Sequence, residues 1–238
     1  MDTRSADLIV GLPGEDGTEP TAIHPTAYTS PGSDWHPLDG NPGDLVAGSP
    51  RLNIAQAELA AAALLAALGV PADSEVARRT PARMVAGLAE LLTCPPWEFT
   101  TFPNREYQHE LVLVRDVPFT SMCAHHLLPF SGVAQVGVLP GERIAGLSKL
   151  ARAVEVFAAR MQVQEELGQQ IAAYLDQQLQ CRGVGVVLVA EHLCMTRRGV
   201  RAAGAAAITI ATRGQLRDDL AARAEFLQLT TAQIRSAP

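Results

Sequence analysis

The stretch "GLSKLARAVEVFAARMQVQEELGQQIAAYLDQQL", residues 146–179, decides the fold because it predicts two helices in series. Apolar residues recur at helical spacing in its first half, namely Leu150, Val154, Phe157 and Met161. The second half repeats that spacing with Val163, Leu167, Ile171, Tyr174 and Leu175. Each half is therefore expected to bury one face.

Strand-like runs flank this helical stretch on both sides. "ELVLVRDV" (110–117) and "GVAQVGVLP" (132–140) precede it, and "VGVVLVAEHLCM" (184–195) and "AAAITIATR" (205–213) follow it. Their composition and their Gly or Pro boundaries are typical of strands. The order strand, strand, helix, helix, strand, strand predicts an α+β domain with two helices on one face of an antiparallel sheet.

The residues before this core predict a helical hairpin and a tail. Apolar spacing predicts one helix from Ile54 to Leu68, ending before Gly69, and a second helix starting at Thr80-Pro81. Residues 1–50 hold seven of the sixteen prolines and eight acidic residues against one arginine, which predicts a disordered acidic tail. We therefore expect one domain over residues 51–238, with a helical segment at 53–95 and the sheet core at 108–215.

Charge and hydropathy exclude several classes of partner. The whole chain carries a formal charge of −6 and the tail about −7, so the remainder is near +1 and has no basic field for nucleic acid. No apolar run is long enough to span a membrane, and the N-terminus lacks a secretory pattern. We expect a cytosolic protein whose cysteines are reduced.

Residues 121–130, "SMCAHHLLPF", predict half of a metal site. Cys123 and His126 can reach one ion from a single turn, and in an extended strand His192 and Cys194 would share one face. Catalytic zinc uses three protein ligands and an open position, for which Cys123, His126 and Cys194 are the candidates. His125 and His192 would then be proton carriers beside the metal.

A second group of candidate binding residues lies at the start of the first long helix. Ser148 is expected to cap the helix, with Lys149 and Arg152 in its first turn, where free N–H groups and cations suit a phosphate. Lys149 is the one lysine of the chain, although a chance surface base is the alternative. Cys94 and Cys181 have no neighbouring ligands in the pattern and are interpreted as plain thiols.

Together these residues resemble the GTP cyclohydrolase I family over about residues 53–230. The resemblance is carried by "RDVPFTSMCAHHLLPFSGVAQVGVLP", "GLSKLARAVEVFAARMQVQEEL" and "EHLCMTRRGVR", with "RTPARM" upstream and "RAEFL" downstream. It implies a ββααββ tunnelling fold, a homodecamer with active sites between subunits, and zinc-dependent conversion of GTP to 7,8-dihydroneopterin triphosphate and formate.

The resemblance also implies residue roles. Cys123, His126 and Cys194 match the zinc ligands, His192 the general acid/base, and His125 a histidine held near the substrate. Gln164 and Glu165 match the residues that read guanine. The triphosphate contacts are matched by Ser148, Lys149, Arg152, Arg198 and, from a neighbouring subunit, Arg83.

Three positions depart from the family pattern. Ala124 stands where glutamate is usual, Glu166 where arginine is usual, and Ala86 where lysine is usual. Loss of the lysine predicts weaker GTP binding, by about 1–2 kcal/mol. The other two changes would together remove an ion pair. The alternative is a GTP- and zinc-binding paralogue that regulates a partner, performs ring opening alone, or serves a deazapurine pathway.

Overall fold

The computed structural model describes residues 52–94 and 96–231. The predicted tail lies outside the described residues. Contacts divide the described chain into two units, one covering 53–85 and the other running from Ala86 onward. No helix in the described ranges is both long and apolar enough to cross a membrane.

The first unit contains α2 (Ile54–Ala67) and most of α3 (Glu75–Leu92). The end of α2 agrees with the prediction, and Gly69 follows it with a φ of 84°. The predicted start of the next helix at Thr80-Pro81 is wrong: Pro81 lies inside α3. Ser74 begins the helix instead, because its Oγ accepts a hydrogen bond from the Ala77 N–H at 3.1 Å.

A five-stranded sheet forms the second unit, in the order β5-β2-β3-β6-β7. The strands are β2 (Val112–Cys123), β3 (Pro129–Leu139), β5 (Met161–Gln162), β6 (Gly183–His192) and β7 (Ala207–Gly214). All neighbours are antiparallel except β2 and β5. A separate pair joins β1 (Thr101–Pro103) to β4 (Arg143–Ala145).

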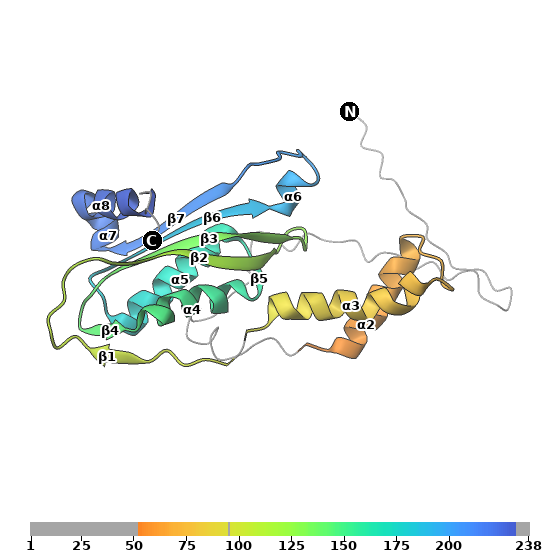
Figure 1. Cartoon of the computed structure of the whole chain (residues 1–238), viewed down its shortest axis with the longest axis horizontal. Coiled ribbons are helices and arrows are strands. Elements are labelled where there is room, and N and C mark those ends of the chain that lie inside the picture. The colour runs from red at the N-terminus through yellow and green to blue at the C-terminus, as the bar shows by residue number, and fades with distance from the viewer. Residues whose placement is uncertain (1–51, 95, 232–238) are drawn as a thin grey trace, which may run out of the picture. The chain divides into compact units, whose positions relative to one another are not determined.

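The predicted helices α4 (Leu147–Ala158) and α5 (Gln164–Leu179) cover one face of this sheet. Figure 1 shows both on the same side, with β6 and β7 following them. The ββααββ order and the α+β class are therefore confirmed. The fully buried side chains Phe157, Leu167 and Ile171 belong to this core.

Two C-terminal helices that were not predicted cover the opposite face of the sheet. After β7 the chain forms α7 (Gln215–Asp218) and α8 (Leu220–Thr231), which lie across the sheet from α4 and α5 in Figure 1. Leu216 and Phe226 are fully buried there against Leu139 and Val187. Each face of the sheet therefore has its own apolar cluster.

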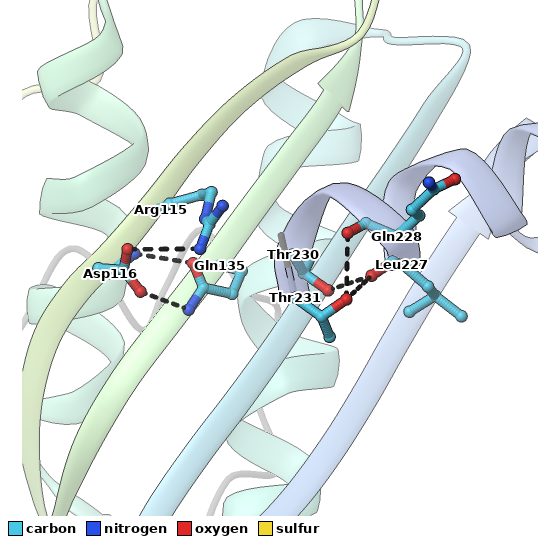
Figure 2. A network of polar contacts seen from close by, with 7 residues as sticks. All are labelled: Arg115, Asp116, Gln135, Leu227, Gln228, Thr230 and Thr231. Atoms are coloured by element: carbon cyan, nitrogen blue, oxygen red, sulfur yellow. Dashed lines mark hydrogen bonds and ion pairs between the residues drawn. The ribbon is translucent and has the colours of Figure 1, made fainter. Parts of the chain in front are cut away.

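A bulge in β2 changes which side chains face which cluster. Its register shifts between Val114 and Val117, and Asp116 has a φ of 55°. Gln135 secures the bulge, because its Oε1 accepts from the Asp116 N–H at 2.7 Å and its Nε2 donates to Asp116 Oδ1 at 3.1 Å (Figure 2). Arg115 also lies 3.7 Å from the Asp116 carboxylate.

The extra residue has a consequence for Cys123. Before the bulge, the odd-numbered Leu111 and Leu113 pack on the α8 side. After it, the odd-numbered Val117, Phe119 and Cys123 pack on the α4 and α5 side. Because one added residue reverses the alternation of a strand, the bulge determines which face carries the Cys123 thiol.

Candidate metal centre

Cys123 and Cys194 bring two thiols together at one end of the sheet. Cys123 is the last residue of β2, and its Sγ lies 4.0 Å from Cys194 Sγ. Two thiolates bound to one tetrahedral zinc at about 2.3 Å would lie about 3.8 Å apart. The observed separation and the soft donor set therefore fit a zinc ion.

His192 completes the group that the distances define. Its ligating atom and the two sulfur atoms all lie within 4.8 Å of one another. The predicted strand register for this pair is wrong, because β6 ends at His192 and Cys194 belongs to the short helix α6 (Leu193–Thr196). A tight turn, and not strand alternation, returns the Cys194 thiol to the site.

His125 and His126 lie in the exposed turn between β2 and β3. Each Nδ1 is 3.9 Å from Cys123 Sγ. The turn is closed by a hydrogen bond of 2.9 Å from the Cys123 N–H to the Leu128 carbonyl oxygen. Leu127 within it adopts the left-handed conformation, with a φ of 51°. Among the described residues, His126 does not belong to the group formed by Cys123, His192 and Cys194. The structure therefore places His126 next to Cys123 but not within 4.8 Å of all three members.

The His192 ring is held on two sides. Phe130 stacks on it with centroids 4.4 Å apart and planes at 5°. Its Nε2 lies 2.6 Å from Gln164 Oε1. Burial lowers the pKa of His192, and the nearby Glu165 carboxylate opposes that shift. The neutral imidazole is therefore favoured, with the Glu165 carboxylate close enough to act on it electrostatically.

Glu191 ties α6 to the end of β6. Its Oε1 accepts from Thr196 Oγ1 at 2.7 Å, and Arg197 approaches the same oxygen at 3.7 Å. Burial, and then the neighbouring Cys123, raise the pKa of Cys194. Arg198 acts in the opposite direction on that thiol, so this exposed predicted phosphate contact lies near the metal centre.

The two predicted guanine contacts have different surroundings. Both begin α5, where Glu165 is exposed and Gln164 is only 2% exposed. The Gln164 amide nitrogen donates to Leu188 O, Ala207 O and Thr209 Oγ1. As placed, Glu165 can meet a substrate, whereas the Gln164 amide is engaged within the protein.

The predicted phosphate residues of α4 lie far from the thiols. Helix α4 ends next to them, because β5, which follows it, pairs with Met122 and Cys123. Twelve helical residues span about 18 Å, so Ser148 and Lys149 lie roughly that far from the metal centre at the other end of the helix. Figure 1 shows the start of α4 beside β4 and its end beside β5.

This remote end of α4 has its own geometry. Lys149 Nζ donates to Glu98 O at 2.5 Å and lies 6.0 Å from the centre of the Trp97 ring. Arg152 forms an exposed ion pair with Glu155 at 3.3 Å. The expected capping role of Ser148 is wrong, because Gly146 occupies the capping position and Ser148 lies in the first turn.

A cavity of about 670 Å³ runs along α4, from Ser148 near its start to Ala158 at its end. Residues of three segments line it, the end of α3, the middle of β2 and one face of α4, among them Thr93, Thr120, Ser148, Arg152 and Glu155. It is separate from the thiol pair, which contributes no residue to its lining. Arg83 is exposed on α3 in the first unit.

The departures from the family pattern also have places in the structure. The Ala124 N–H donates to Gln162 O at 3.0 Å, so Ala124 lies beside the entrance to α5. Glu166 is half-buried in the first turn of that helix, and Ala86 is exposed on α3. The proposed loss of an ion pair stays a prediction.

Sequence reasoning missed two supports of the metal centre, the Phe130 stack and the Glu191–Thr196 hydrogen bond. Phe130 was inside the quoted motif, but its pairing opposite His192 in the β3–β6 ladder is a tertiary feature. Thr196 follows Glu191 by five residues, a spacing that signals nothing unless the strand is known to end between them.

Comparison with known proteins agrees with this geometry. The family model described as GTP cyclohydrolase I matches residues 57–231. The protein named GTP cyclohydrolase 1 of Mycolicibacterium vanbaalenii is 48% identical over 184 residues, covering 75% of this chain and 91% of that protein. The Geobacillus kaustophilus protein of the same name is 45% identical over 188 residues, covering 77% and 100%.

A solved structure, the apo form of the archaeosine synthase QueF-Like, is 16% identical and covers 44% of this chain and 93% of its own, with a TM-score of 0.35. The sequence comparisons carry the assignment. With a family model matching most of the chain and relatives close to half identical over most of their length, this chain belongs to the GTP cyclohydrolase I family.

Proposed function

We propose that this protein is a zinc-dependent GTP cyclohydrolase I that converts GTP to 7,8-dihydroneopterin triphosphate and formate. The observation that carries the proposal is the pair of thiols 4.0 Å apart beside His192 and Glu165. Membership of the family supports the choice of GTP as substrate. The cytoplasm is the proposed location.

Cys123, Cys194 and His126 would hold the zinc ion. When bound, zinc supplies a water molecule activated for attack at neutral pH, here on C8 of the guanine ring. His192 is the alternative third ligand, because a nitrogen of its ring lies within 4.8 Å of both thiol sulfur atoms, whereas His126 is not part of that group. Zinc content of the His126→Ala and His192→Ala variants separates the two sets, since loss of a ligand empties the site and loss of a neighbour does not.

The chain's own residues supply the remaining chemistry. Glu165, exposed at the start of α5, can accept from the N1–H and the 2-amino group of guanine. His192 is favoured in its neutral form, so it can accept a proton and return it during ring opening and ribose rearrangement. His125, 3.9 Å from Cys123 Sγ by its Nδ1, would contact the substrate.

The triphosphate would be held by residues of another copy of the chain. Ser148 and Lys149, at the start of α4, lie about 18 Å from the thiols of their own chain, too far for one GTP to reach both, and Arg152 lies about one turn nearer. A neighbouring subunit that brings this end of α4 to the metal centre removes the difficulty. We propose a homodecamer of such composite sites, with Arg198 from the metal-binding chain and Arg83 from a neighbour completing the anion site.

Product analysis tests the activity. Zinc-loaded protein incubated with GTP is expected to release formate and the pterin triphosphate in equal amounts. An opened nucleotide with no pterin would assign ring opening alone, and absence of formate at saturating zinc and GTP would remove the catalytic proposal.

Subunit complementation tests the composite site. His192→Ala and Arg152→Ala are each expected to be inactive alone. After the two are dissociated, mixed and reassembled, about a quarter of the sites would combine a native His192 with a native Arg152 and regain activity. A mixture no more active than the separate variants would contradict a site shared between chains.

A further inference from the structure

Gln164 has a fixed amide orientation in the core. Its side chain is 2% exposed at the start of α5. The Nε2 atom lies 3.2 Å from Leu188 O and 3.1 Å from Ala207 O. Backbone carbonyl oxygens only accept hydrogen bonds, so the group that faces them is the amide nitrogen. The amide oxygen must therefore face the other way.

That oxygen points at one nitrogen of the His192 ring. Gln164 Oε1 lies 2.6 Å from His192 Nε2. An amide oxygen cannot donate, so a hydrogen bond at this distance requires the proton on Nε2. Phe130, parallel to the ring at 4.4 Å, fixes the plane in which the bond is made.

We propose that Gln164 is a positioning residue that holds His192 as the Nε2–H tautomer and leaves the lone pair on Nδ1. The catalytic consequence rests on the proposed function, but the tautomer itself does not. With Nε2 protonated, Nδ1 is the atom that accepts a proton in catalysis, or that binds the ion if His192 is a ligand. This role replaces the guanine contact expected for Gln164, whose amide groups are already engaged inside the protein.

The substitution Gln164→Met tests the proposal, because methionine has a similar length and offers His192 no strong acceptor. Thr209→Val is the matched control. It removes a hydrogen bond to Gln164 Nε2, made at 3.2 Å, and leaves the bond from Oε1 to His192 in place. A merely structural role for Gln164 would make the two variants behave alike.

Kinetics give the first readout. Gln164→Met is expected to lower kcat for formate release by about ten- to a hundredfold, as for a general acid/base held in the wrong tautomer or orientation. KM for GTP should stay within about twofold, and Thr209→Val should keep the wild-type kcat. A raised KM with an unchanged kcat would overturn the proposal and make Gln164 a substrate contact.

Solid-state NMR of the holoenzyme with 15N-labelled histidine rings gives a second readout that needs no turnover. Protonated and bare ring nitrogens have well-separated signals, and a His192→Asn spectrum assigns the signal of interest. The wild-type protein is expected to show a protonated Nε2 and an unprotonated Nδ1 on His192. The Gln164→Met variant is expected to show a mixture of the two tautomers.

A wild-type His192 protonated on Nδ1 alone would overturn the proposal even if no Gln164 variant folds. Lack of formate production in the wild type, with the Nε2–H tautomer present, would count against the proposed function and leave the positioning role standing. The two failures are therefore distinguishable.

Discussion

Phe226 is the side chain by which α8 packs on the sheet, and two glycines make room for it. It is fully buried, and its ring lies over Gly137 of β3 and Gly185 of β6. A Cβ added at Gly185 would lie 2.5 Å from Phe226 Cε1 and 2.6 Å from Cζ. Replacing Gly185 by alanine therefore forces the ring, and with it α8, away from the sheet.

The energies follow from packing. Phe226→Ala leaves a cavity and is expected to cost about 3–5 kcal/mol of unfolding free energy. For Gly185→Ala, overpacking of about 1–3 kcal/mol is partly offset by the better strand propensity of alanine, which leaves a cost of about 1–2 kcal/mol. In the double variant the new methyl group occupies space vacated by the ring. The double variant should thus be at least about 1 kcal/mol more stable than the sum of the single changes predicts.

Urea unfolding followed by circular dichroism measures the cycle, at one protein concentration because the proposed subunit association would contribute to stability. Gly168→Ala in α5 is the control, since its Cβ would meet Ala211 Cβ at 3.5 Å and Leu188 Cδ1 at 3.7 Å, which are ordinary contacts. It should stabilise the protein by up to about 1 kcal/mol. Additive effects of Gly185→Ala and Phe226→Ala would refute the packing argument.

Two further predictions concern the metal centre, and a third concerns Cys181, before the start of β6 and therefore at the end of that strand away from the metal centre. Thr196→Val, which removes the hydrogen bond to Glu191 made at 2.7 Å, should weaken zinc binding about tenfold in a chelator competition, whereas Thr212→Val on β7 should not. Chelation of zinc should expose two further thiols to a thiol reagent, and an unchanged count would argue against thiolate ligation. Burial and then the Asp176 carboxylate raise the pKa of Cys181 to about 12, so it should stay protonated and alkylate far more slowly at pH 8 than a free thiol, as peptide mass spectrometry can measure.

The sequence predicted the central architecture because its elements are strongly periodic. Helices α4 and α5 bury the residues that the 3.6-residue spacing selected, such as Phe157 and Ile171. Runs of β-branched residues between Gly and Pro boundaries marked the four long strands. Element ends were predicted less well: Ser74 and Gly146, and not Thr80 or Ser148, precede the helices, because several capping arrangements compete within a few residues.

The residue types of the metal centre were also present in the sequence. The cysteines and histidines in "SMCAHH" and "EHLCM" indicated that the two segments bind one metal ion together. The structure places the sulfur atoms of Cys123 and Cys194 4.0 Å apart. Their geometry was not predictable from spacing. His192 and Cys194 were expected to share a strand face, but the chain leaves β6 between them.

Only the tertiary structure determined which face of the sheet a β2 side chain occupies and which groups the Gln164 amide contacts. The alternation of β2 reverses at a bulge that Gln135 secures from the neighbouring strand, so the face of Cys123 depends on a residue twelve positions later. The expected guanine contact of Gln164 stays a prediction, and only the fold shows that carbonyl groups of β6 and β7 orient its amide toward His192. Local sequence determines periodicity and chemistry, because both depend on neighbouring residues. Strand register and hydrogen-bond partners depend on groups that meet only when distant segments pack.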